Sequence, residues 1–306
     1  MTPRGGWPIP FLGVEPGGAC RRGWTWRDLT AALVLVALAV YATWGAWWDI
    51  YDIAARDEEH SHAFLVPVVA AWLLWVRRER LRGYAPTGTW LGPVVVAVGW
   101  AIHRYGDAQL VQTLWHAGAI LVVTGAFLTV AGAGFLVRCF PAFLALGFLV
   151  PVPNMVRQAV SIPLQGATAE VTRVVLETFG ASVERTGNTL RINNQDVLIA
   201  EACNGLRMVF ALVLVSYTFA LGSPLRWSFR ALVVLASPLT AIVFNVIRLV
   251  PTVWAFGSLP ADAATTLHDM SGWLMLPFAF LTLVVLLRTL RWAQVPITPF
   301  VLAHGS

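Results

Sequence analysis

Repeated apolar runs constrain this chain more than any other feature of its sequence. Runs of roughly 15–25 residues recur along its length, about the 20 residues that a helix needs to cross a bilayer. Only 12% of the 306 residues are charged, about half the share of an ordinary soluble domain. The sequence therefore predicts a single polytopic, all-α membrane domain.

The apolar runs predict eight membrane spans. They lie at about 29–48, 63–76, 88–104, 111–131, 134–150, 205–222, 231–254 and 270–287. The second run is short, and the fifth contains Arg138 and Pro141. No internal repeat is evident.

The arginines between the predicted spans give the orientation. With eight spans, one face of the membrane carries Arg21, Arg22, Arg27, Arg77, Arg78, Arg80, Arg82, Arg138, Arg226, Arg230, Arg288 and Arg291. The positive-inside rule makes that face the cytoplasm, and both termini lie there. We expect a cytoplasmic tail at 1–27, a transmembrane domain at 28–292 and a second cytoplasmic tail at 293–306. Because this bias explains the net charge of +5, we expect no nucleic-acid partner.

The longest outer segment, residues 151–204, has its own pattern. Residues 154–178 have helical apolar spacing, which predicts an amphipathic helix on or in the outer interface. The following stretch alternates apolar and polar residues, with turn signals at Gly187-Asn188 and Asn193-Asn194. It predicts a small β-hairpin.

Three reactive residues fall near the outer ends of predicted spans. Cys203 begins the sixth span, Arg248 lies toward the outer end of the seventh and His268 opens the eighth. The predicted topology therefore gives them a shared depth. Cys20 and Cys139 fall on the inner side, so Cys203 is a lone thiol facing an oxidising compartment.

The surroundings of Cys203, in the stretch EACNGLR, favour a reactive thiol. A helix N-terminus and nearby cations lower the pKa of a thiol and favour the thiolate. Arg207 lies one turn beyond the cysteine, and Glu201 and Asn204 flank it. The alternative interpretation is a small apolar residue packed at a helix start.

Arg248 and His268 also have two interpretations each. An arginine inside an apolar run is costly unless it is paired or reaches the interface, so a functional role is the default hypothesis. Asn245, one turn earlier, is placed to orient Arg248. His268 is either an interfacial residue or, beside a thiol at the same depth, a general acid and base.

A second polar cluster, DEEHSH at 57–62, contains two histidines and four other polar residues. Its spacing fits no strong zinc pattern. We therefore interpret it as a polar outer loop and predict neither a metal nor a cofactor.

Several motifs, taken in order, resemble the exosortase/archaeosortase family of membrane cysteine proteases with transpeptidase-like chemistry. The family's thiol motif appears as EACNGLR, its N-x-x-R motif as NVIR (245–248) and its C-terminal histidine motif as LHDMSGW (267–273). Residues 149–180 resemble the family's P-x-P segment and the helix that follows it. The resemblance covers about residues 44–290, and Asn204 stands where many members have serine.

The resemblance implies an activity and a substrate class. Cys203 would be the nucleophile, Arg248 a catalytic arginine and His268 the acid/base. The partners would be exported proteins whose C-terminal tail has a short signature (Pro-Glu-Pro in one subgroup), a transmembrane helix and a basic cluster, met within the membrane lipid. The site would then face the outer side of a bacterial inner membrane, and the thioester would pass to water or to an amine acceptor.

Three other functions remain open on the sequence. A transporter or channel would have polar residues near the middle of several spans, whereas here they gather at one face. A transferase acting on lipid-linked groups would need an acidic metal motif or an inner-face site. A non-catalytic assembly factor for surface polysaccharide would not need its thiol.

Overall fold

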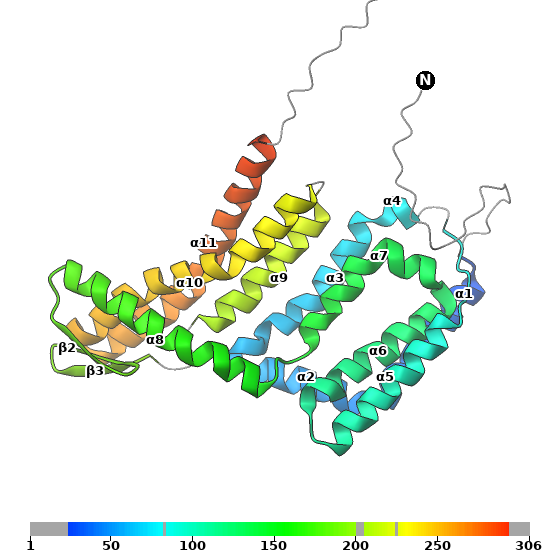
Figure 1. The fold of residues 1–306 in the computed structure, drawn as a ribbon, viewed down its shortest axis with the longest axis horizontal. Helices are drawn as coiled ribbons and strands as arrows, with labels where there is room; N and C mark the ends of the chain where they lie inside the picture. Colours follow the sequence, from blue (N-terminus) through cyan, green and yellow to red (C-terminus); the bar gives the residue numbers. More distant parts are fainter. Residues whose placement is uncertain (1–23, 82–83, 200–204, 224–225, 294–306) are drawn as a thin grey trace, which may run out of the picture.

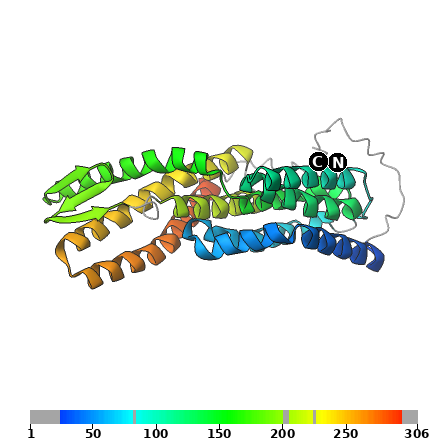
Figure 2. The ribbon, with the colours of Figure 1, turned by 90° about the horizontal axis from the view of Figure 1, so that it is seen from below.

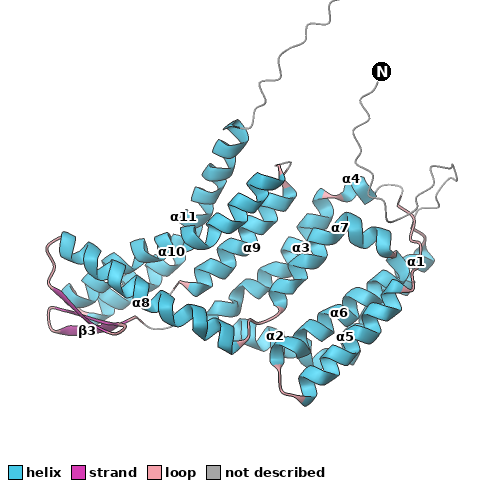
Figure 3. Cartoon of the chain, in the orientation of Figure 1, coloured by secondary structure: helices cyan, strands magenta, loops and turns pink. Residues whose placement is uncertain are grey.

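The computed structural model describes residues 24–81, 84–199, 205–223 and 226–293, and helices dominate it (Figure 3). The elements are α1 (Trp26–Ala42), α2 (Trp44–Arg56), the 3-10 helix η1 (Glu58–Leu65), α3 (Val66–Val76), α4 (Arg78–Leu81), α5 (Leu91–Ala108), α6 (Gln112–Ala131), α7 (Ala133–Ala145), the 3-10 helix η2 (Leu146–Leu149), α8 (Asn154–Thr178), β1 (Val183–Thr186), β2 (Thr189–Ile192), β3 (Gln195–Leu198), α9 (Leu206–Gly222), α10 (Trp227–Ser258) and α11 (Ala261–Ala293). Most of each predicted tail lies outside the described residues.

The eight predicted spans all lie mainly in helix, but fewer qualify as membrane spans. Within the described residues, Glu59–Val76, Gln112–Ala131 and Trp227–Ser258 are long and apolar enough. Two bent pairs raise the number to five: α1 with α2, bent by 74°, and α7–η2 with α8, bent by 81°. Length and composition therefore support three to five spans, and the number eight is not confirmed.

Local breaks in the helices explain in part why fewer than eight helices qualify as membrane spans. The first predicted span, 29–48, is interrupted at Thr43, where α1 ends and α2 leaves in another direction. The fifth is kinked at Cys139, two residues before Pro141, because proline removes a helical hydrogen bond and clashes with the preceding turn. The sixth, α9, has only 17 residues.

Helices α5 and α6 approach each other unusually closely through glycines. Gly92, Gly99 and Gly106 recur at seven-residue intervals on α5. The first two lie beside Gly125 and Gly118 of α6, and Gly106 lies against the backbone of Trp115. A Cβ added at Gly118 would lie 2.3 Å from the backbone nitrogen of His103. Small residues at this spacing let two helix backbones pack together inside a membrane, so these two helices form a tight hairpin.

Residues 154–199 form the predicted helix and hairpin and add one strand. Helix α8 covers the predicted range 154–178, and both turns occur where the sequence places them. The predicted hairpin is extended to an antiparallel sheet of three strands, in the order β1-β2-β3. Gly187, Asn193 and Asn194 take positive φ values of 63°, 50° and 64°, which glycine and asparagine tolerate better than other residues.

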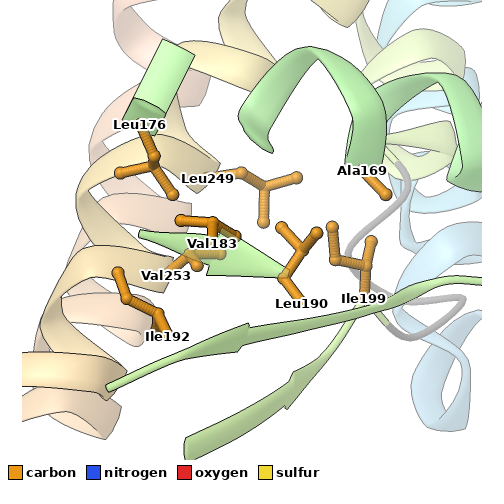
Figure 4. Packing of buried hydrophobic residues seen from close by; sticks show 8 residues of the cluster. All are labelled: Ala169, Leu176, Val183, Leu190, Ile192, Ile199, Leu249 and Val253. Carbon is orange, nitrogen blue, oxygen red and sulfur yellow. The ribbon is translucent and has the colours of Figure 1, made fainter. Parts of the chain in front are cut away.

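One face of this sheet packs between α8 and the C-terminal half of α10 (Figure 4). The shared core contains Ala169, Leu176, Val183, Leu190, Ile192, Ile199, Leu249 and Val253. At this end of the molecule α8, α10 and α11 lie in successive layers (Figure 2). The sheet and α8 therefore hold the part of α10 that carries Arg248.

The opposite ends of the helices are joined by two arginines from predicted cytoplasmic connections. Arg77, at the end of α3, donates to the carbonyl oxygen of Leu221 in α9 (2.8 Å). Arg230 of α10 donates to that of Ser223 (3.2 Å). Figure 1 shows this end of α3, α9 and α10 at the top and α8 across the other end. The candidate site lies near α8, at the end remote from these arginines.

Candidate active site

The thiol motif enters the described structure at Gly205. Glu201, Cys203 and Asn204 lie outside the described residues. Gly205 is the N-cap of α9, with φ of +84°, a left-handed conformation that favours glycine. Arg207 follows in the first turn of α9 and is half-buried. The residues after the thiol therefore begin a helix, as the sequence predicts.

Gly205 lies directly against Asn245 of α10. A Cβ added at Gly205 would lie 2.8 Å from Cγ and 2.9 Å from Nδ2 of Asn245, closer than side chains pack. Asn245 is fully buried. The glycine of the first motif and the asparagine of the second are therefore in contact, although 40 positions separate them.

Arg248 is buried one helical turn after Asn245. Its side chain is 9% exposed, inside a helix whose apolar window has a mean hydropathy of 2.0. Its neighbour Leu249 belongs to the core beneath the sheet. The protein therefore covers the Arg248 side chain, and little of it reaches solvent.

Two hydroxyl groups set the register of α10 against α11. Thr252 donates to the carbonyl oxygen of Arg248 (2.8 Å), and Ser271 donates to that of His268 (2.8 Å). The two hydroxyl oxygens lie 3.5 Å apart. Both residues are buried, so the backbones of Arg248 and His268 are held by one contact between the helices.

The same register sets Arg248 and His268 at different levels. The helices are antiparallel, and Thr252 and Ser271 lie level with each other. Arg248 lies about one turn from this level toward the start of α10. His268 lies about one turn from it in the opposite direction, toward the end of α10. At 1.5 Å per residue, the two residues are separated by roughly 10 Å along the helix axes. The His268 ring accordingly contacts Phe256, with centroids 6.3 Å apart. The shared depth is therefore approximate.

His268 lines a cavity with the last strand of the sheet. The cavity has a volume of about 270 Å³ and is lined by Gln195, Asp196, Val197, Leu198, Phe256 and His268. Leu198 is thus near His268, whereas Gly205 contacts Asn245. Leu198 and Gly205 lie on either side of the segment that contains Cys203, so one flank of that segment shares a cavity with His268 and the other contacts Asn245.

The DEEHSH segment forms most of η1 and connects three elements. Asp57 accepts from the backbone N–H of Glu59 (2.9 Å) and pairs with the His60 ring (2.9 Å). Glu59, with a side chain only 6% exposed, pairs with Arg157 of α8 (3.2 Å). The His62 ring stacks on Phe210 of α9, with centroids 5.2 Å apart. The segment therefore contacts α8 and α9 and is more buried than a polar outer loop.

A buried polar pair nearby escaped the sequence analysis. His116 of α6 is fully buried, and its Nε2 lies 2.9 Å from a carboxylate oxygen of Asp49 in α2. Gln112, one turn before His116, donates to the same oxygen (2.8 Å). The i, i+4 spacing of Gln112 and His116, which places both side chains on one face of a helix, was the sequence feature that could have indicated this site. Within the described part of the chain, no group of three or more His, Cys, Asp or Glu side chains is placed to hold a metal ion.

Comparison with known proteins gives one match. The family model of transmembrane exosortases matches residues 47–285, from α2 to α11, and so includes both flanks of the candidate site. No curated protein and no solved structure matches the chain.

Proposed function

Because the chain belongs to the transmembrane exosortase family, we propose that it is a cysteine protease or transpeptidase of the membrane. It cleaves the C-terminal sorting tails of exported proteins at the outer face of the bacterial inner membrane. The contact between Gly205 of the thiol motif and Asn245, one turn before the buried Arg248, carries this proposal. A buried cation next to a thiol motif is the arrangement that thiolate chemistry needs.

The proposed reaction assigns each residue one task. The Cys203 thiolate attacks the carbonyl carbon of the scissile peptide. Arg248 stabilises the thiolate and the oxyanion, because a fixed cation in a low-dielectric site is effective there. His268 protonates the leaving amine, and water or an amine acceptor then resolves the thioester.

Four further residues of the motifs support these tasks. Asn245 orients Arg248 from one turn away. Arg207 lowers the pKa of the thiol together with the helix N-terminus. Glu201 and Asn204 flank the thiol and position it.

The proposal is tested by comparing the C-terminal peptides of exported proteins, by mass spectrometry, in cells with the wild-type and the Cys203→Ala protein. Tails with an apolar helix and basic residues should accumulate only in the variant. Cys139→Ala is the matched control, because Cys139 is packed in a core with Tyr84 and Phe135, remote from the motif; its cells should process tails normally.

The mature termini also identify the acceptor. A free carboxylate indicates hydrolysis, and an added mass at the same residue indicates transfer to an amine. Matching profiles in wild-type and Cys203→Ala cells, with both proteins present in the membrane, would refute thiol catalysis and favour the transporter or assembly-factor interpretation.

A further inference from the structure

The strand β3 forms one edge of the sheet, and its hydrogen-bonding pattern follows from its turn. The two-residue turn before β3 makes Gln195 the first hydrogen-bonded partner of β2, so Val197 is the second. Asp196 and Leu198 fall at the intervening, non-hydrogen-bonded pairs. The N–H of Ile199, one residue later, donates to the carbonyl oxygen of the residue preceding β2 (2.9 Å), as this alternation requires. The backbone N–H and C=O groups of Asp196 and Leu198 therefore point away from β2.

The two edges of the described sheet differ. At β1, Arg185 pairs with Glu170 of α8 (2.9 Å), which ties that edge to the helix. Strand β3 contains neither lysine nor proline, the residues that usually protect a strand edge. Leu198 is 64% exposed. Within the described residues, no strand pairs with the outward edge of β3.

The one charge on β3 is engaged by its neighbour. Asp196 accepts from Arg191 of β2 (2.7 Å), and this hydrogen bond holds the pKa of the Asp196 carboxyl below its usual value. The pair lies across β2 and β3 on the sheet face opposite the core, since Leu190 and Ile192 occupy the inner face. It does not obstruct the edge.

The cavity described above adjoins this strand. All four residues of β3 line it, together with Phe256 and His268. A strand added beside β3 would thus run past the imidazole that the proposed reaction uses to protonate the leaving amine. The four residues of β3 extend about 13 Å, enough to pair with about four residues of a peptide.

We propose that the edge of β3 binds the extended segment of the substrate polypeptide as a fourth strand, through the backbone groups of Asp196 and Leu198. An extended peptide is the occupant that these groups fit, because a helix or a lipid chain offers no matching row of backbone donors and acceptors. Main-chain hydrogen bonds supply affinity and hold the peptide extended beside His268, whereas its side chains select the register. This inference rests on the proposed proteolytic function and specifies how the substrate is held.

The decisive variant is Leu198→Pro in the full-length protein. Proline removes an N–H that β2 does not use, and its ring projects where the added strand would lie. The internal ladder of the sheet keeps its donors. Using an exported protein whose tail accumulates in Cys203→Ala cells as the substrate, we expect Leu198→Pro to raise KM at least tenfold and to change kcat less.

The matched control is Ser182→Pro, an exposed position just before β1, on the opposite edge. It should leave KM within about twofold of wild type, since β1 makes no contact with the substrate. A wild-type KM for Leu198→Pro would overturn the edge proposal, as would equal increases for the two proline variants.

Photo-crosslinking gives a test that does not depend on the stability of Leu198→Pro. With p-benzoylphenylalanine in place of Leu198, in the Cys203→Ala background, sequenced crosslinks should map to the extended segment just before the tail helix. The same group in place of Glu184, on β1, should give none. Crosslinks from both positions, or from neither, would overturn the proposal.

The two proposals fail in different ways. Normal tail processing in Cys203→Ala cells refutes the proteolytic function, whatever happens at β3, and removes the basis of the edge proposal. Blocked processing in those cells, with a wild-type KM for Leu198→Pro and no crosslink from position 198, refutes the edge alone.

Discussion

At the scale of single residues, Gly205 connects the thiol motif to α10. Two requirements meet there: a left-handed backbone at the start of α9 and a close approach to the side chain of Asn245. A Cβ would make the left-handed backbone costly and would clash with the Asn245 side chain. The start of α9, and with it the chain that leads from Cys203, is therefore positioned by the absence of a side chain.

We expect Gly205→Ala to reduce both stability and tail processing. The left-handed conformation costs an alanine about 1–2 kcal/mol, and the contact with Asn245 forces α9 away from α10. Gly180→Ala is the matched control, because Gly180 has a similar φ of +86° but open space around its Cβ. The measurement is the thermal midpoint and the processing of each variant; equal losses would show that the Asn245 contact is unimportant.

At the scale of elements, the ion pair between Glu59 and Arg157 fixes α8 to η1. Arg157 lies in the first turn of α8, and Glu59 lies 98 positions earlier with its side chain 6% exposed. Helix α8 turns by 81° from the preceding helices and carries the sheet at its far end. The pair therefore helps to set where β3 and its cavity lie.

Arg157→Met should destabilise the protein by about 3 kcal/mol, because it leaves the buried Glu59 carboxylate without this cation. Arg56→Met is the comparison: Arg56 pairs with Asp52 at 2.8 Å, but its side chain is 79% exposed, so the loss should be under about 1 kcal/mol. Thermal unfolding in one detergent measures both. Adding Glu59→Gln to Arg157→Met should restore part of the loss; similar losses for Arg157→Met and Arg56→Met would contradict a structural role for the buried pair.

At the scale of the whole molecule, the number of membrane crossings depends on helices such as α5. It is 18 residues long and does not qualify as a span by itself. Its glycine contacts with α6, which does qualify, bring the two backbones together along most of their length. We expect α5 to cross the membrane with α6 as its partner.

Cysteine labelling tests this crossing. Thr87→Cys and Gln109→Cys lie at exposed positions before and after α5, and each is introduced into a protein with Cys20→Ala, Cys139→Ala and Cys203→Ala. An impermeant maleimide should label Gln109→Cys on intact spheroplasts, and Thr87→Cys only after permeabilisation. Labelling of both from one side would mean that α5 does not cross, and the eight-span topology would be wrong.

The local features of this protein could be predicted from its sequence. Apolar periodicity located most of the helices and the range of α8, although residues 49–56 continue α2 instead of starting a loop. Asparagine and glycine located both turns, because these signals depend on neighbouring residues. The ordered motifs indicated the family, and the family match confirms it. The roles of Cys203, Arg248 and His268 stay predictions.

The relations between distant segments became visible in the folded structure alone. It determined that Gly205 meets Asn245, that Arg248 and His268 lie at different levels, and that β3 borders the cavity of His268. It also showed that the DEEHSH segment, predicted as a polar loop, is partly buried and is joined to α8 by the pair between Glu59 and Arg157. Spacing could not give these results, because a helix register or a strand edge depends on packing between elements, and one sequence records only the order of its residues.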